Sequence, residues 1–214
     1  MKDEYPENYW DKLSGDDEHA ADYMRSYGEG PGFATRHTIG NVINDGESVL
    51  DVGCGPGWNF DHFMQYGPAI SNYRGLDYSR RFVRVANQRA MQTAGTSTGP
   101  FEYGDARDLK EADNSWDVVI LQDCLEHTNG YEKPIQEALR VAKKRIIISF
   151  WHLDNTLTPH INDDGDDGWG AWYDKAKWEK FLDTLGYMWI HDEIFPKDKL
   201  HSWHFYVIDK EEPR

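Results

Sequence analysis

Residues 49–59 read VLDVGCGPGWN, an apolar run that ends in Asp51 and is followed by three glycines within five residues. The run predicts a buried strand, and the glycines predict a tight turn into a helix. Short apolar segments recur between helical patterns after it, so we expect an α/β fold with a mostly parallel sheet. We expect strands at 47–52, 72–77, 100–106, 116–123 and 145–151, and helices from residue 57 onward, at 80–94 (with Ser79 as its N-cap) and at 131–143.

The first part of the chain departs from this alternation. Residues 1–45 are polar with scattered aromatic side chains, and helices are expected there around 16–27 and 33–44. No composition break or linker divides the sequence further, so we interpret the 214 residues as one domain. Within that domain we distinguish three parts, 1–45, 46–151 and 152–214.

The last part of the chain also changes character. Residues 152–173 form a long connection that is rich in glycine and aspartate and shows little regular pattern. Connections of this length are often functional. A helix is expected after it near 174–185, and then two strands, 187–195 and 202–209, that can pair as a hairpin.

Charge and composition limit the possible partners. The formal net charge is −15 and no basic stripe is visible, which argues against nucleic acid and against an anionic membrane surface. Cys54 and Cys124 form no CxxC pair, which suggests a reducing compartment without a disulfide framework. The sequence shows neither an apolar stretch of membrane-spanning length nor a secretory signal, so we expect a cytoplasmic protein. The oligomeric state is left open.

The glycine-rich turn could belong to several kinds of site. A phosphate-binding P-loop needs a lysine that this turn lacks, and a dinucleotide site prefers the spacing GxGxxG, whereas Gly53, Gly55 and Gly57 are spaced GxGxG. The strands that follow are more informative. Asp77 ends the second expected strand, 20 residues after Gly57, and Asp105 lies at the end of the third. Carboxylates at successive strand ends meet at the ligand-binding edge of an open α/β sheet.

These segments resemble a known family. VLDVGCGPG, GLDYS and YGDARDL are similar to the first three motifs of class I S-adenosylmethionine (SAM)-dependent methyltransferases, and residues 116–149 resemble the block that follows them. The resemblance implies a Rossmann-like fold with helices on both faces of a seven-stranded, mostly parallel sheet. The implied strand order is 3-2-1-4-5-7-6 with an antiparallel last strand, and the N-terminal part is implied to be a helical lid.

The resemblance also implies SAM as the cofactor, with S-adenosylhomocysteine (SAH) as the product. Gly53 and Gly55 would let the backbone approach the methionine part, and Asp51 would help to hold its ammonium group. Asp51 could instead be a simple turn residue, and Cys54 is interpreted as a small packing residue rather than a nucleophile. The full set of implied cofactor residues is Asp51, Gly53, Cys54, Gly55, Gly57, Asp77, Tyr78, Asp105, Ala106 and Gln122.

Four of these residues have implied contacts beyond the turn. Asp77 would accept hydrogen bonds from the ribose hydroxyls, and Tyr78 would pack on the adenine. Asp105 would face the adenine amino group, with the backbone N–H of Ala106 beside it. In the lid, the implied contacts are Tyr9, Trp10, Tyr27 and Arg36; Arg36 either pairs with the methionine carboxylate or lies on a solvated helix face.

A second motif, QDCLEH at 122–127, has two interpretations. On a helix, Asp123, Glu126 and His127 would share one face and could hold a divalent metal. The spacing is similar to the E-x-x-E-H of metal-dependent O-methyltransferases, although Asp123 replaces the first glutamate. We favour a structural role over metal binding and keep His127 and His152 as candidate catalytic residues. A fourth metal ligand would have to come from His152, Asp154 or His160.

The connection after the fifth strand matches the region that covers the acceptor pocket in the resembling family. Its aromatic residues could form a wall that suits a flat or cationic acceptor, or they could simply pack in the core. The candidate acceptor-binding residues are Trp151, Trp169, Trp172 and Tyr173.

The sequence therefore predicts a SAM-dependent methyltransferase that acts on an O or N atom of a small molecule. One alternative is a metal-assisted O-methyltransferase that uses Asp123, Glu126 and His127. Another is a module that binds SAM or SAH without turnover. The acceptor itself cannot be read from the fold, because one cofactor scaffold serves many substrates.

Overall fold

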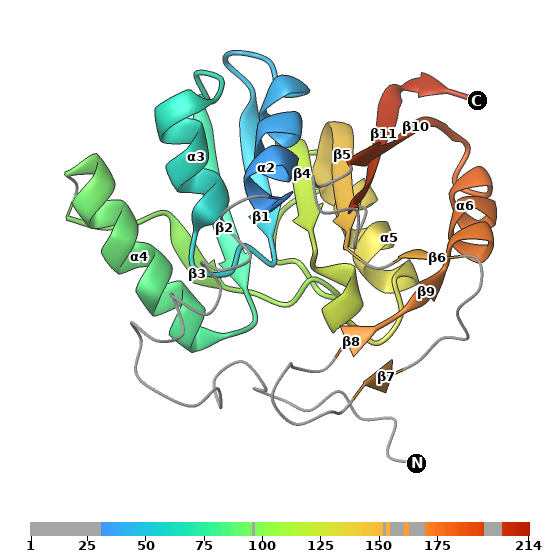
Figure 1. The fold of residues 1–214 in the computed structure, drawn as a ribbon. Coiled ribbons are helices and arrows are strands. Elements are labelled where there is room, and N and C mark those ends of the chain that lie inside the picture. The colour runs from blue at the N-terminus through green and yellow to red at the C-terminus, as the bar shows by residue number, and fades with distance from the viewer. Residues whose placement is uncertain (1–30, 96, 152, 155–160, 163–169, 195–202) are drawn as a thin grey trace.

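The computed structural model describes residues 31–95, 97–151, 153–154, 161–162, 170–194 and 203–214. Helices flank a central sheet, and two small sheets lie beside it (Figure 1). The helices are α2 Pro31–Asn41, α3 Trp58–Tyr66, α4 Arg80–Ala94, α5 Glu132–Val141 and α6 Lys175–Asp183, with a 3-10 helix, η2, at Leu125–His127. The strands are β1 Ser48–Val52, β2 Asn72–Asp77, β3 Phe101–Tyr103, β4 Trp116–Gln122, β5 Ala142–Phe150, β6 Leu153–Asp154, β7 Ile161–Asn162, β8 Gly170–Ala171, β9 Tyr173–Asp174, β10 Tyr187–Ile194 and β11 Trp203–Pro213.

The central sheet has seven strands in the order β3-β2-β1-β4-β5-β11-β10. Strands β1 to β5 pair in parallel, whereas β11 is antiparallel to both of its neighbours. Numbered within this sheet, the order is 3-2-1-4-5-7-6 with the last strand antiparallel, which confirms the expected topology. The predicted C-terminal hairpin is confirmed as β10 and β11.

Two apolar layers bury the sheet between helices. On one face, Ile39 of α2 and Phe63 of α3 pack against β1, β4, β5 and β11. On the other face, Ile135 of α5 and Trp178 of α6 pack against the same strands, and both side chains are fully buried. Because Ile39 is part of this core, α2 is a core helix rather than a separate lid. The helix expected around 16–27 lies outside the described residues.

Local signals explain where several elements begin. The Ser79 hydroxyl accepts a hydrogen bond from the Phe82 N–H, so the predicted N-cap of α4 is confirmed. The third strand is shorter than expected, ending at Tyr103, because the chain turns at Gly104 toward Asp105. The fifth strand begins earlier than expected, at Ala142, directly after α5 ends.

The segment 152–173 was expected to lack regular structure, and this was partly wrong. Strands β6 and β9 pair in parallel, and β7 and β8 pair antiparallel, which gives two short ladders beside the main sheet. Each strand has two residues, too short to produce a period-2 pattern in the sequence. These ladders bring residues 170–174 to the end of β5.

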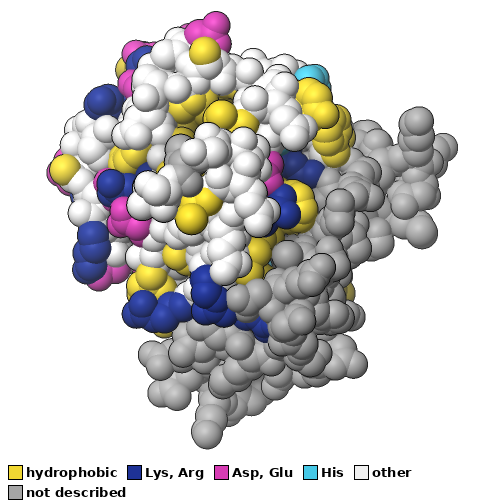
Figure 2. Space-filling view, turned by 90° about the vertical axis from the view of Figure 1, so that its left-hand side faces the viewer, with side chains coloured by type: hydrophobic (Ala, Val, Ile, Leu, Met, Phe, Trp, Pro, Cys, Tyr) yellow, Lys and Arg dark blue, Asp and Glu magenta, His cyan; other side chains and the backbone are white. Residues whose placement is uncertain are grey.

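The surface around α4 carries charges of both signs. Figure 2 shows this face, where basic and acidic side chains both occur. Among the described residues, no helix combines the length and the apolar character needed to cross a membrane.

Candidate active site

A pocket opens at the carboxyl ends of β1, β2 and β4 and beside the turn that follows β3. In an open α/β sheet this edge is the usual ligand-binding position. Four successive turns therefore contribute to one pocket, and α2 and η2 close it. The lining residues are Gly32, Arg36, Gly53, Cys54, Gly55, Pro56, Trp58, Asn59, Asp77, Tyr78, Phe82, Gly104, Asp105, Ala106, Arg107, Gln122, Asp123, Cys124, His127 and Thr128.

The glycine-rich turn has three glycines at positive φ, with values of 75° at Gly53, 52° at Gly55 and 86° at Gly57. Their surroundings differ. A Cβ on Gly53 would lie 2.6 Å from the Cys124 Sγ, and one on Gly57 would lie 2.8 Å from the Phe101 ring. A Cβ on Gly55 would meet no described atom within 4 Å. Packing therefore requires two of the glycines, and Gly55 is the one that leaves open space beside the backbone.

Asp77 connects this turn to β2. One carboxylate oxygen accepts a hydrogen bond from the Gly55 N–H at 2.8 Å, and the other accepts one from the Ser79 N–H at 2.8 Å. The side chain is buried but lines the pocket. A carboxylate has about four lone-pair sites, so it can accept more hydrogen bonds than these two. Asp77 thus shapes the turn and still presents an acceptor to the pocket.

The end of β3 supplies a second acid beside an aromatic pair. Arg107 donates to Asp105 through Nε at 2.9 Å and through Nη2 at 2.7 Å. Burial alone would raise the pKa of Asp105, but the hydrogen bonds from Arg107 outweigh it and hold this pKa below its usual value. The rings of Tyr78 and Tyr103 lie 5.5 Å apart, and the Arg107 guanidinium lies 5.8 Å from the Tyr78 ring. This end of the pocket therefore combines a charged acceptor with a flat surface.

Asp51 lies beneath the pocket rather than in its lining. One oxygen accepts hydrogen bonds from the Tyr73 hydroxyl at 2.6 Å and from the Asn59 amide at 3.1 Å. The other oxygen is buried without a hydrogen-bond partner among the described residues. Burial raises the pKa of Asp51 to about 6, although both donors oppose this. Asp51 is therefore more than a turn residue, because it holds Asn59, which does line the pocket.

The opposite side of the pocket is formed by the end of β4. Asp123 has a φ of 47°, and its carboxylate accepts hydrogen bonds from the Ser149 hydroxyl at 2.7 Å and the Trp203 indole at 3.3 Å. Burial raises the pKa of Asp123, and these donors counteract part of the rise. Ser149 and Trp203 could not be recognised as partners of Asp123 from the sequence, since they lie 26 and 80 residues away.

The expected helical face of Asp123, Glu126 and His127 does not form. The three residues span a turn and the short 3-10 helix η2, so the α-helical spacing does not apply. Glu126 is 1% exposed and accepts a hydrogen bond from the Trp151 N–H at 2.8 Å, whereas His127 lines the pocket. Within the described part of the chain, the three side chains do not bring their ligand atoms within 4.8 Å of one another. This geometry favours the structural interpretation of Glu126.

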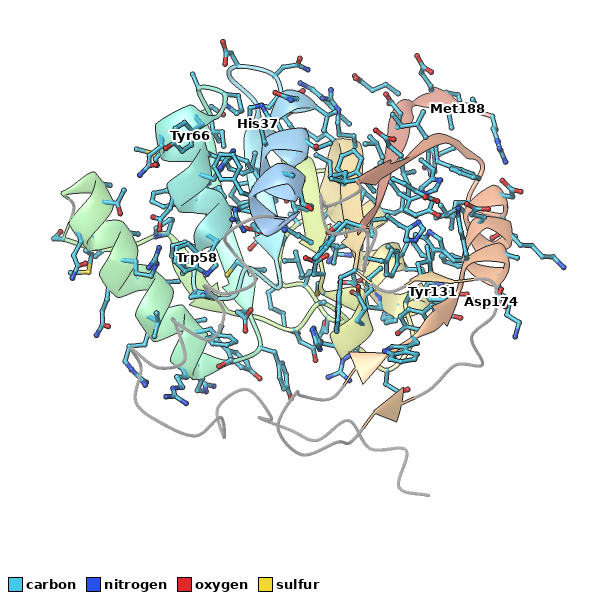
Figure 3. The ribbon with its side chains drawn as sticks, in the orientation of Figure 1. His37, Trp58, Tyr66, Tyr131, Asp174 and Met188 are labelled. Carbon is cyan, nitrogen blue, oxygen red and sulfur yellow. The ribbon has the colours of Figure 1, made fainter. Side chains whose placement is uncertain are left out.

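The expected acceptor-side aromatic residues are arranged differently from the prediction. The Tyr173 ring is buried in the core, 5.0 Å from the ring of Tyr131, the N-cap residue of α5, which is labelled in Figure 3. Its hydroxyl donates to the Leu125 carbonyl at 3.0 Å and to the Thr128 carbonyl at 2.9 Å. Tyr173 therefore supports η2 from behind instead of lining the pocket. Trp151 and Trp172 are half-buried and are not among the described lining residues, while His152 and Trp169 lie outside the described residues.

A cation and two thiols complete the electrostatics of the pocket. Arg36 reaches it from α2 and is 7% exposed. Burial lowers the pKa of Arg36 to about 10, with Asp123 and Asp61 opposing the shift, so it stays charged at neutral pH. Burial raises the pKa of the Cys54 and Cys124 thiols well above the usual value. Both thiols are therefore protonated, consistent with packing rather than nucleophilic roles.

Comparison with known proteins agrees with this geometry. Residues 50–150 match the family model described as a methyltransferase domain. Ajmaline N-methyltransferase from Rauvolfia serpentina is 33% identical over 113 residues, which are 52% of this chain and 38% of that enzyme. The match thus spans well under half of this curated relative.

Solved structures extend the likeness to most of the chain. The YcgJ protein from Bacillus subtilis has a TM-score of 0.67 at 15% identity, covering 83% of this chain and 97% of that one. Magnesium protoporphyrin IX methyltransferase from Synechocystis, solved with bound SAM, has a TM-score of 0.57 at 23% identity and covers 82% of this chain and 75% of that one. At these identities the likeness establishes the fold.

The fold is the Rossmann-like α/β fold that these methyltransferase structures share, with a pocket at the carboxyl ends of its strands. Residues 50–150 are similar to the methyltransferase domain family, and the resemblance of the chain to class I SAM-dependent methyltransferases is confirmed.

Proposed function

We propose that the protein transfers a methyl group from SAM to an O or N atom of a small molecule. The observation that carries this proposal is the pocket itself, which is lined by the carboxylates of Asp77 and Asp105 and by Gly55, with open space beside the Gly55 backbone. A nucleoside linked to an amino acid needs acceptors for the ribose and adenine and a close backbone approach for its charged tail. The SAM bound in the related Synechocystis enzyme supports this choice of cofactor.

The chain's own residues can be assigned to the parts of that cofactor. Asp77 accepts hydrogen bonds from the ribose hydroxyls in addition to those from the N–H groups of Gly55 and Ser79. Tyr78 supplies a flat surface for the adenine, and Asp105 and Ala106 face its edge. The methionine end lies against Gly53 and Gly55. The remaining assigned residues are Cys54 and Gln122 in the pocket lining and Asp51 and Gly57 behind it.

Arg36 is assigned to the carboxylate of the methionine part. Its guanidinium is buried, charged and in the pocket lining, and a guanidinium matches a carboxylate with two parallel hydrogen bonds. The charge of Arg36 balances the charge of that carboxylate, so no additional cation is needed at that end of the pocket.

The transfer step needs little chemistry from the protein. The sulfonium of SAM activates the methyl group, so the chain must position the acceptor and exclude water. A hydroxyl or protonated amine must also lose a proton, and His127 lies in the pocket lining where it can receive one. The carboxylate of Asp123 lies on the same side of the pocket. It can orient the acceptor by accepting a hydrogen bond from its O–H or N–H group. His152 remains a second candidate base.

A small acceptor is favoured over a macromolecule. The chain carries a net charge of −15, which opposes binding to nucleic acid phosphates, and the relative from Rauvolfia serpentina is named for a small-molecule acceptor. An amine acceptor would also be attracted to the acids of this pocket. We therefore propose amines and hydroxyl compounds as the acceptor classes to screen.

The experiment is a turnover assay. Purified protein is incubated with SAM and a panel of small amines and hydroxyl compounds, with and without EDTA, and SAH release is measured. Acceptor-dependent SAH that is insensitive to EDTA supports the proposal, and His127→Gln should lower that rate while cofactor affinity is retained. Loss of activity in EDTA with recovery by Mg²⁺ would favour metal assistance. Cofactor binding without SAH release from any acceptor would instead indicate a non-catalytic module.

A further inference from the structure

Three side chains with metal-binding atoms gather outside the pocket, on the C-terminal hairpin. His191 and Glu193 are two residues apart on β10, so they point to the same face of the sheet. His204 of β11 is the cross-strand partner of Glu193 and shares that face. His204 also pairs with Phe150, the last residue of β5. The group therefore lies at the same edge of the sheet as the pocket, on the second and third strands from β4.

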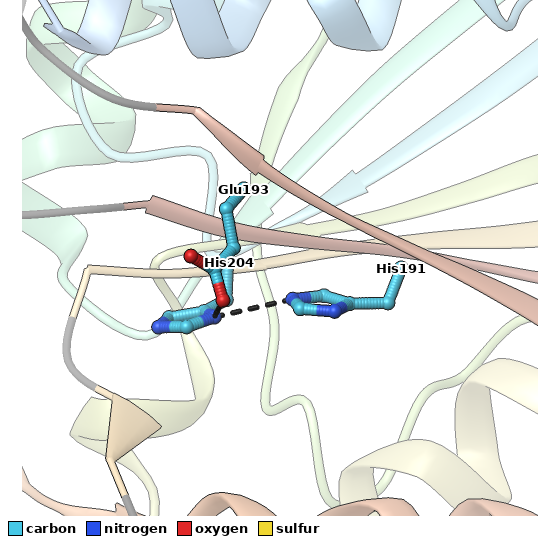
Figure 4. A group of neighbouring side chains, drawn as sticks. All are labelled: His191, Glu193 and His204. Carbon is cyan, nitrogen blue, oxygen red and sulfur yellow. Dashed lines mark hydrogen bonds and ion pairs between the residues drawn. The ribbon is translucent and has the colours of Figure 1, made fainter.

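The distances within this group match those around a small tetrahedral ion. The His204 Nδ1 lies 3.2 Å from the His191 Nε2 and 3.7 Å from the Glu193 Oε1 (Figure 4). All three ligand atoms lie within 4.8 Å of one another. Bonds of about 2.0–2.1 Å at tetrahedral angles place ligand atoms roughly 3.3 Å apart. A small inward movement of the glutamate would complete three corners of such a site.

The two imidazoles are also held in place. Their rings stack 5.4 Å apart with an interplanar angle of 13°, and the His191 ring stacks on Tyr206 at 4.4 Å. His204 is 6% exposed. The facing nitrogens share one hydrogen bond, so the ring that donates it must change its tautomer to present a lone pair to an ion. Fixed rings reduce the entropy that ligands lose when they bind an ion.

A competing cation lies beside the group. The Lys175 Nζ, from the first turn of α6, is 3.2 Å from the Glu193 Oε1. This ion pair neutralises the carboxylate while no metal is bound. A dication would have to displace the ammonium, and Lys175 also lies 3.9 Å from the Glu179 carboxylate, which can receive it.

We propose that His191, Glu193 and His204 form a binding site for Zn²⁺ or a similar divalent transition metal, with a fourth position open to water. Two imidazoles and one carboxylate are a ligand set that zinc accepts. The ion would fasten β10 to β11 where the hairpin meets the end of β5. This proposal does not depend on the proposed methyltransferase function, because none of the three residues lines the described pocket.

The test uses the full chain without an affinity tag, treated with EDTA and dialysed. Zn²⁺ is titrated by calorimetry, and Co²⁺ is titrated by visible absorption, whose intensity distinguishes tetrahedral from octahedral coordination. We expect one ion per chain and a tetrahedral cobalt spectrum. His191→Gln should weaken binding by more than about 100-fold, which exceeds the 10–100-fold typical of residues behind the ligands. Lys175→Met should tighten it by roughly two- to fivefold, because a partly exposed ion pair is weak.

Matched controls keep the outcome clear. His37→Gln removes an exposed imidazole on α2 and should leave the metal affinity unchanged. Melting curves recorded in EDTA establish that each variant is folded without metal. Failure of the folded wild-type protein to bind Zn²⁺ or Co²⁺, or equal affinity in wild-type and His191→Gln proteins, would overturn the proposal.

Discussion

The two sides of the pocket are built in different ways. On the β1–β3 side, both partners of Asp77 lie in recognisable motifs: Ser79 in GLDYS and Gly55 in VLDVGCGPG. On the β4–β5 side, Asp123 is held by Ser149 and Trp203, from 26 and 80 residues away. The first side can be recognised from short motifs, whereas the second exists only after the sheet has assembled. Substitutions on the two sides should therefore differ in how they change SAM affinity and the free energy of unfolding.

The largest effect is expected at Gly53. Alanine there would have its Cβ 2.6 Å from the Cys124 Sγ, at a φ of 75°. The clash and the left-handed backbone together should lower the free energy of unfolding by about 2–5 kcal/mol. Gly55→Ala is the matched control, since it carries only the backbone strain of about 1–2 kcal/mol. Urea unfolding compares the two, and equal losses would show that the contact with Cys124 is unimportant.

The next effect concerns the ligand rather than the fold. Asp77→Asn should weaken SAM binding by about 1.5–3 kcal/mol, because charge-assisted hydrogen bonds to the ribose are lost. Equilibrium dialysis with labelled SAM measures the change. Asp108→Asn, an exposed acid next to the same pocket wall, serves as the control and should leave the affinity unchanged. Full affinity in a folded Asp77→Asn protein would remove Asp77 from the ribose site.

The pH dependence of stability should reveal Asp51. Its pKa is raised by burial to about 6, so the folded protein binds this proton more tightly than the unfolded chain. The wild-type protein should therefore lose stability relative to Asp51→Asn as the pH rises from about 4 to 6, by on the order of 2 kcal/mol. Urea unfolding of both proteins at pH 4.5, 5.5 and 7 tests this. A stability difference that is constant with pH would mean that Asp51 titrates normally.

The smallest effect is expected on the long-range side of the pocket. Ser149→Ala removes the 2.7 Å hydrogen bond to Asp123 and should cost about 1–2 kcal/mol of unfolding free energy. SAM affinity should stay within about twofold, since Asp123 is assigned to the acceptor. Ser115→Ala, which removes an exposed hydroxyl bonded to the Ala112 carbonyl, is the control for both measurements. A large loss of SAM affinity in Ser149→Ala would contradict the division of the pocket into two sides.

The sequence predicted much of the fold for a physical reason. Buried parallel strands are short apolar runs, and the caps and turns between them require particular residues, such as Ser79 before α4 and Gly57 before α3. The strand order was available only through the family resemblance. Expectation and structure differ where a motif was assumed to be helical, because QDCLEH turns at Asp123 and continues as a 3-10 helix.

Contacts between distant segments could not be read from the sequence. Tyr173 was expected in the acceptor pocket, but the β6–β9 ladder places it behind η2, where its hydroxyl satisfies two carbonyls. The period-2 spacing of His191 and Glu193 is visible in the sequence. The register that sets His204 opposite Glu193 is not, because it depends on hairpin pairing.

A calorimetric titration of the folded protein with SAM, SAH and NAD tests the assignment of the pocket most directly. We expect micromolar binding of SAM and SAH with a stoichiometry of one, no binding of NAD, and a weaker SAM interaction in Asp77→Asn. Binding of NAD in place of SAM, or no binding of either SAM or SAH, would contradict the assignment of this pocket to a sulfonium cofactor.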